Sequence, residues 1–307
     1  MVRVLLKRYL RWAIVAAAIA FLAHTLAGHW AEVVAIRLRS QGLWRLLLAT
    51  AVSLLAHSWA GWVWSWILQA LQQPIGGRWS MPVYLKTNLL KYLPGNVWHF
   101  YGRVRALGDR GIAKGPAIVG VVLEPLLMAN AALLLGLASP TRYWPGQILL
   151  LGLALGAIHP RWLNPVMNRL GQAKAKHDLK KDDLDEPLPS AALHRYPLKP
   201  LAGEMGFVLL KGIGFALVIS AVSPLPTSQW LSVVSLFSLA WLAGLVIPGA
   251  PGGLGVFEAI AVTLLQDTLS AGVILSAVAL YRLVGTLAEA LGAGLAVLGE
   301  EGSRFKV

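Results

Sequence analysis

The sequence predicts an all-α, polytopic integral membrane protein of about seven to eight transmembrane helices. Of its 307 residues, 57% are hydrophobic and only 13% are charged, and the mean hydropathy is +0.63. A soluble domain carries about 25% charged residues, so this chain has too little polar surface for a water-soluble particle. A cytosolic globular enzyme, a disordered chain and a fibrous repeat are therefore excluded. The chain has no cysteine, which excludes a disulfide framework, a thiol nucleophile and a cysteine-ligated metal.

Seven stretches are apolar enough to cross a bilayer, which takes about 20 residues. They lie near residues 12–28, 43–71, 116–137, 144–158, 203–222, 230–247 and 270–298. The first could be a signal peptide, because basic residues precede it. Its apolar run is long, however, and no convincing cleavage site follows, so we interpret it as a retained membrane helix.

The net charge is +13, and the basic residues lie between the apolar runs. This placement indicates that they set the orientation of the chain in the membrane rather than bind nucleic acid. Residues 1–11 carry four basic residues and no acid, residues 78–114 carry seven against one, and residues 223–229 carry none. This alternation predicts a cytoplasmic N-terminus in the plasma (cytoplasmic, or inner) membrane. The 29–42 loop, with Arg37 and Arg39, is the exception.

The chain divides into a first membrane half (1–158), a hydrophilic linker (159–202) and a second membrane half (203–307). The linker mixes eight basic and five acidic residues and is rich in proline, which is typical of a cytoplasmic connection. The alternative is that the linker binds anionic lipid, but its acidic residues offset the basic ones.

Each half contains an apolar segment that cannot form one continuous helix. Segment 83–103 is interrupted at Pro94-Gly95-Asn96, where proline removes a backbone donor and glycine adds freedom. Segment 245–266 contains Pro248, Gly249, Pro251, Gly252, Gly253 and Gly255. Irregular backbone at membrane depth must be buried in protein or line a wet cavity.

The prolines that open the two breaks, Pro94 and Pro248, lie 154 positions apart. Matched broken segments in two halves are typical of a transporter's binding site and suggest inverted repeats. Half-helix N-termini at such a site favour an anion such as a phosphate headgroup. Two ordinary turns at helix ends are the alternative. The glycine cluster is no nucleotide loop, since it lacks a preceding strand and a Walker lysine.

Ionisable side chains in apolar segments are candidate functional groups, because each costs about 2.5–3.5 kcal/mol at mid-bilayer. Arg103, Arg282 and Lys91 are the expected ligands of a headgroup phosphate. The carboxylates expected to balance them in the empty site, or to carry a coupling proton, are Glu124, Glu258 and Glu289. The alternative is that these charged side chains form internal ion pairs that fasten helices, or extend to the membrane surface. Lys211 is the residue for which this alternative is most favoured. His57 is expected to be a packing group.

These segments also resemble a known family. Residues 251–258, Pro-Gly-Gly-Leu-Gly-Val-Phe-Glu, resemble the hallmark of the lysylphosphatidylglycerol synthase transmembrane-domain (flippase-like) family. Asn88, Lys91 to Asn96 and Gly102-Arg103 resemble its first-half motif, and Tyr281-Arg282 resembles its last-helix pair. The resemblance implies movement of a lipid, or a lipid-like amphiphile, between leaflets. We expect a stand-alone member without the aminoacyl-transferase domain.

This chain has Trp98-His99-Phe100-Tyr101 where many members of that family place a carboxylate, so the charge preference is not carried over. The predicted function is a lipid flippase-like transporter that is not an enzyme and needs no cofactor or metal. Its expected partner is a membrane lipid, with an anionic headgroup as one option, and the oligomeric state, including a homodimer, stays open. The alternatives are a membrane-embedded lipid-carrier transferase and a non-catalytic scaffold subunit. The predicted substrate-binding residues are Asn88, Lys91, Pro94, Gly95, Asn96, Arg103, Glu124, Gly252, Gly253, Gly255, Glu258, Tyr281, Arg282 and Glu289.

Overall fold

The protein is a multi-pass, all-α membrane protein, and the computed structural model confirms this predicted class. It describes residues 41–93, 97–138, 144–166, 169, 192–246, 256–266 and 269–304. Five long helices within these ranges are apolar enough to span a membrane. They are α3 (Gly42–Ala70), α6 (Lys114–Gly136), α9 (Leu198–Val222), α10 (Trp230–Val246, with the 3₁₀ turn Thr227–Gln229) and α12 (Ala271–Arg304, apolar to Gly299).

These five helices match five of the seven predicted segments to within a few residues. The predicted segment 144–158 forms α7 (Trp144–Ala157), which has 14 residues and is shorter than a spanning helix. The predicted segment 12–28 lies outside the described residues. Helix α9 begins at Leu198, five residues earlier than predicted, and so takes in the last residues of the predicted linker.

Described helices lie on either side of both predicted breaks, and at the first break the helix ends before the extended residue Leu93. In the first segment, α4 (Gly77–Asn88) tightens into the 3₁₀ helix η1 (Leu89–Tyr92), and α5 (Trp98–Gly108) follows. In the second, α10 ends at Val246 and α11 (Val256–Leu265) follows. The break residues themselves, 94–96 and 247–255, lie outside the described residues.

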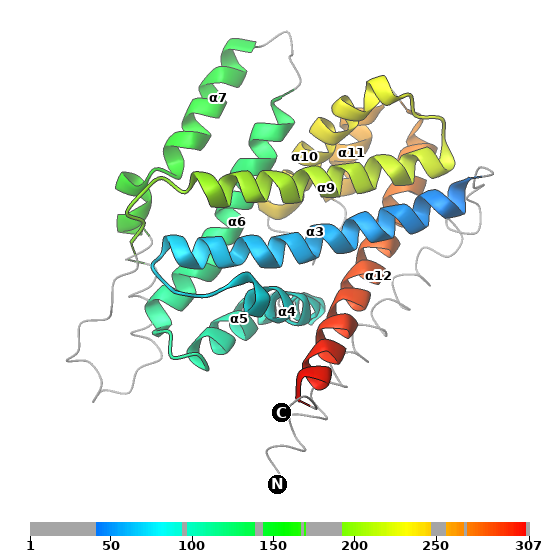
Figure 1. Cartoon of the computed structure of the whole chain (residues 1–307). Helices are drawn as coiled ribbons and strands as arrows, with labels where there is room; N and C mark the ends of the chain where they lie inside the picture. The colour runs from blue at the N-terminus through cyan, green and yellow to red at the C-terminus, as the bar shows by residue number, and fades with distance from the viewer. Residues whose placement is uncertain are drawn as a thin grey trace.

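The same order of four helices occurs twice. We call α3 to α6 the first unit and α9 to α12 the second unit. Each helix of the second unit begins 153 to 158 positions after its counterpart. The leading helices, α3 and α9, lie side by side in opposite directions (Figure 1), as inverted repeats require. Trp59 of α3 donates a hydrogen bond to the Gly203 carbonyl of α9 (2.8 Å), and Arg45 at the start of α3 donates to Ser220 near the end of α9.

The last helix of each unit packs against the other unit. Helix α6 contacts α9 and α10, whereas α12 contacts α3 and α4. A glycine permits each approach: a Cβ on Gly136 would meet Leu239 at 2.4 Å, and one on Gly292 would meet Leu85 at 3.0 Å. These glycines are 156 positions apart. Small residues at helix contacts matter in a membrane, because association depends on close packing rather than on exclusion of water.

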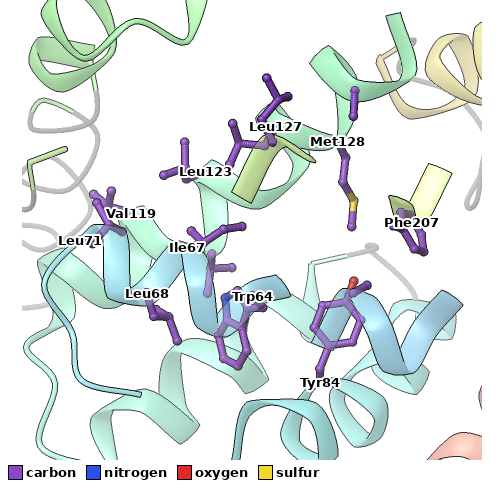
Figure 2. Close-up of a cluster of buried hydrophobic side chains, with 14 of the residues drawn as sticks. Trp64, Ile67, Leu68, Leu71, Tyr84, Val119, Leu123, Leu127, Met128 and Phe207 are labelled. Atoms are coloured by element: carbon purple, nitrogen blue, oxygen red, sulfur yellow. The ribbon is translucent and has the colours of Figure 1, made fainter. Parts of the chain in front are cut away.

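Apolar side chains of α3 and α6 fill the core of the first unit. Figure 2 shows Trp64, Ile67 and Leu68 with Leu123 and Leu127, and all five are fully buried. Phe207 of α9 closes this cluster. The core therefore fixes the positions of α3, α6 and α9, between which charged side chains are held.

Candidate functional site

A buried charge cluster lies where the helices of the first unit meet. Arg103 of α5 forms an ion pair with Glu124 of α6, and both side chains are only 2% exposed. The guanidinium lies over the Tyr84 ring of α4, 3.7 Å from its centroid, and 5.7 Å from the Trp64 ring of α3. Tyr84 is also hydrogen-bonded to Glu124. Each helix of the first unit thus contributes at least one side chain to this cluster.

The guanidinium has several partners, as a desolvated arginine requires. Its Nε donates to Thr87 Oγ1 (3.3 Å), and the ring contacts add cation–π attraction of about 0.5–2 kcal/mol each. Arg103 was predicted to bind a headgroup phosphate. In this conformation, however, it is enclosed and paired with Glu124, so a headgroup can reach it only after the helices move.

The second unit builds the same cluster without charge. Phe215, Phe237, Phe257 and Tyr281 come from α9, α10, α11 and α12, and each lies 151 to 157 positions after its counterpart in the first unit. Their rings pack largely edge to face, with centroids 5.3–5.9 Å apart. Aromatic side chains therefore fill the same place between the helices of the second unit, and this arrangement of helices can form without a buried ion pair.

Helix α12 carries two further ion pairs that bind both broken segments. Lys91 of η1, in the first broken segment, contacts Glu289 of α12 at 2.5 Å. Glu258 of α11, in the second broken segment, accepts a 2.6 Å hydrogen bond from Arg282 Nε. Arg282 and Glu289 are seven positions apart, so they share one face of α12. One helix therefore connects the two broken segments through charged contacts.

These two pairs are more open than the buried charge cluster. The side chains of Lys91, Arg282 and Glu258 are 30%, 22% and 24% exposed, whereas Glu289 is 4% exposed. Glu289 is also held by the Tyr92 hydroxyl, which donates at 2.8 Å. The cations of both pairs are thus accessible, while the Glu289 carboxylate is anchored.

Two buried bases lie close to Glu289. His57 Nε2 of α3 is 3.2 Å from Glu289 Oε1, although outside hydrogen-bond geometry. The Lys211 ammonium of α9 lies 4.9 Å from the Tyr281 ring centroid and interacts electrostatically with Glu289. His57 was expected to be a packing group, and the structure also places it beside the Glu289 carboxylate. Lys211 has no carboxylate within ion-pair distance among the described residues.

Other predicted site residues have different surroundings. Asn88 is buried at the end of α4. Tyr281 is buried in the aromatic cluster, and its hydroxyl donates to the Lys211 carbonyl (3.1 Å). The substrate-binding role of both stays a prediction. Pro94, Gly95, Asn96, Gly252, Gly253 and Gly255 lie outside the described residues.

Sequence reasoning missed one charged residue, Glu204 of α9. Its side chain is fully buried, and neither carboxylate oxygen has a hydrogen-bond partner among the described residues. It lies within electrostatic range of Arg103 and Glu124. Gly203 and Gly206 flank it and allow the close approach of Val63 and Trp59 of α3. These glycines were the available signal that Glu204 belongs to a helix interface.

Comparison of the sequence with protein-family models and with curated proteins gives no match.

Proposed function

We propose that the protein is a flippase-like transporter that moves a phospholipid, or a lipid-like amphiphile, between the leaflets of the membrane. The observation that carries the proposal is that α12 bridges both broken segments through Lys91–Glu289 and Glu258–Arg282. Both cations are partly exposed, and a phosphate can compete for each of them. A headgroup that engages Lys91 and Arg282 would weaken the contacts that hold α12 to the broken segments.

This exchange links binding to movement. Ion pairs between helices hold one arrangement, and an anionic headgroup offers the two cations an alternative partner. The released carboxylates then lose their counter-charges, which favours a different packing of α12. A ligand can shift a conformational equilibrium only by its differential affinity for the two states, and the exchanged ion pairs supply that difference.

The opposite directions of α3 and α9, the leading helices of the two units, support alternating access (Figure 1). Rocking of one unit against the other about a central site is the usual mechanism of inverted-repeat transporters. The resemblance to the lysylphosphatidylglycerol synthase transmembrane-domain family supports a lipid as the substrate class. Together with the charge pattern of the loops, it also supports placement in the cytoplasmic membrane with the N-terminus inside.

The test is lipid translocation by purified protein in liposomes that carry a fluorescent headgroup-labelled phospholipid. Dithionite quenches the outer-leaflet label, so transport appears as loss of the protected inner-leaflet signal. We expect the wild type to accelerate this loss. We expect Arg282→Ala to slow it at least about tenfold, since removing one charged hydrogen bond to a ligand costs about 1.5–3 kcal/mol.

Arg105→Ala is the matched control, because Arg105 is an exposed arginine of α5. It should leave the rate unchanged. The proposal fails if the wild type accelerates no lipid, whether neutral, anionic or cationic, with or without a proton gradient. Activity toward labelled lipid that requires a divalent metal, and is lost with EDTA, would instead favour a lipid-carrier transferase.

A further inference from the structure

Glu204 is a buried carboxylate that the proposed exchange of ion pairs does not use. It lies in the second turn of α9, it is 0% exposed, and its two oxygens accept no hydrogen bond within the described part of the chain. Buried polar groups almost always have a partner, so each exception calls for an explanation.

Among the residues that the structure describes, the groups around Glu204 leave one negative charge without compensation. Arg103 of α5 is the cation within range, and Glu124 of α6 already holds its guanidinium. Two ionised carboxylates would therefore share one guanidinium. An isolated ion of this kind costs several kcal/mol in a protein interior. One bound proton removes the excess charge.

The other described helices packed around Glu204 do not supply a second cation to it. Helix α4 contributes Tyr84, and α3 contributes His57, whose ring lies 6.1 Å from Phe207, one turn from Glu204. Lys211 is two turns further along α9, where it interacts with Glu289 rather than Glu204. The described part of α10 contains no charged residue.

The equivalent position on α3 of the first unit shows that the fold does not need this carboxylate. Ser53 of α3 precedes Glu204 by 151 positions, the same offset that relates Trp64 to Phe215. Ser53 is also fully buried, and its hydroxyl lies 3.3 Å from a Cβ built on Gly214, beside the aromatic cluster. A small neutral side chain therefore fills the equivalent position.

We propose that Glu204, together with Glu124, forms a proton-binding site, with one proton on the Glu204 carboxyl in this conformation. When Arg103 moves away from Glu124, that carboxylate also loses its cation and can accept a second proton. When Arg103 approaches again, the proton returns to water. Coupling of this exchange to transport rests on the proposed function, whereas proton binding by Glu204 does not.

Infrared difference spectroscopy tests proton binding directly. The purified protein in liposomes is taken from neutral to alkaline buffer, and the carbonyl-stretch band of a protonated carboxylic acid is followed. We expect the wild type to show this band at neutral pH and Glu204→Gln to lack it. Asp109→Asn is the matched control, because Asp109 is exposed, and it should keep the band.

The proposal is overturned if the wild type shows no such band, or if the band persists unchanged in Glu204→Gln. Glu204→Ser, which introduces the residue of the equivalent position, serves in the same way should the glutamine variant fail to fold. In the translocation assay, the wild-type rate should change by up to about tenfold per pH unit, as expected for one linked proton. Glu204→Gln should still transport, but with a pH profile that differs from that of the wild type and retains only the contribution of Glu124; a profile identical to that of the wild type would contradict the coupling.

The two proposals fail in different ways. A wild type that moves no lipid but shows the band would refute the flippase function and leave the proton site standing. A wild type that moves lipid but lacks the band would refute the proton site alone.

Discussion

Exchange of the Arg103–Glu124 pair for the residues of the second unit tests whether the buried charge cluster serves the fold. The equivalent positions hold Phe257 and Tyr281, so the variants are Arg103→Phe, Glu124→Tyr and the double replacement. Each single replacement leaves one buried charge without its partner, which costs about 3–5 kcal/mol. If the two changes acted independently, the double variant would lose about 6–10 kcal/mol.

We expect the double variant to lose much less. Replacement of a whole buried ion pair by apolar groups is often neutral, and imperfect repacking costs about 1–3 kcal/mol. The free energy of unfolding of the double variant should therefore lie within about 3 kcal/mol of the wild-type value. The coupling energy between the two sites should exceed about 3 kcal/mol.

The measurement is unfolding of the purified protein by SDS in mild-detergent micelles, followed by tryptophan fluorescence and circular dichroism. Arg105→Gln with Asp109→Asn is the control cycle, because both residues are exposed on α5 and its C-terminal cap. Exposed pairs of this kind couple by only about 0.5 kcal/mol. Additive losses at Arg103 and Glu124 would refute the equivalence of the two clusters.

Three further predictions concern packing and topology. Gly136→Val should destabilise the fold by about 1–3 kcal/mol in the same SDS assay, because its Cβ has no room, whereas Gly152→Val on α7, where a Cβ meets nothing within 4 Å, should have little effect. Trp59→Phe removes the 2.8 Å hydrogen bond to the Gly203 carbonyl and should cost about 1 kcal/mol, which an unchanged unfolding midpoint would contradict. The chain has no cysteine, so Ser228→Cys and Asp109→Cys each give a unique thiol. A membrane-impermeant maleimide applied to intact cells should label the first and not the second, and the reverse pattern would invert the predicted orientation.

The sequence was sufficient to predict helices and breaks because both depend on local chemistry. Apolar runs of spanning length became helices such as α3 and α12, and separate described helices lie on either side of Pro94 and Pro248. The offset of 154 positions between the breaks also anticipated the repeated helix order. Features that depend on neighbouring residues in the sequence were therefore predictable, to within a few residues at the helix ends.

The partners of the charged residues were not predictable, because they depend on how distant helices cross. Lys91 and Glu289 are 198 positions apart, and no sequence periodicity connects them. Glu204 lay one residue inside a predicted span and was overlooked among nearby linker charges. The uncharged counterpart of the Arg103–Glu124 pair became visible only when the four helices of each unit were compared in space.

The exchange of last helices between the two units has a consequence for biogenesis. Helix α6 ends at Gly136, but its partner α10 is complete only at Val246. At about 5–20 residues per second, a ribosome needs roughly 5–20 s to synthesise the intervening 110 residues. During that interval α6, with Glu124 on it, waits in or beside the insertion machinery without its final neighbours.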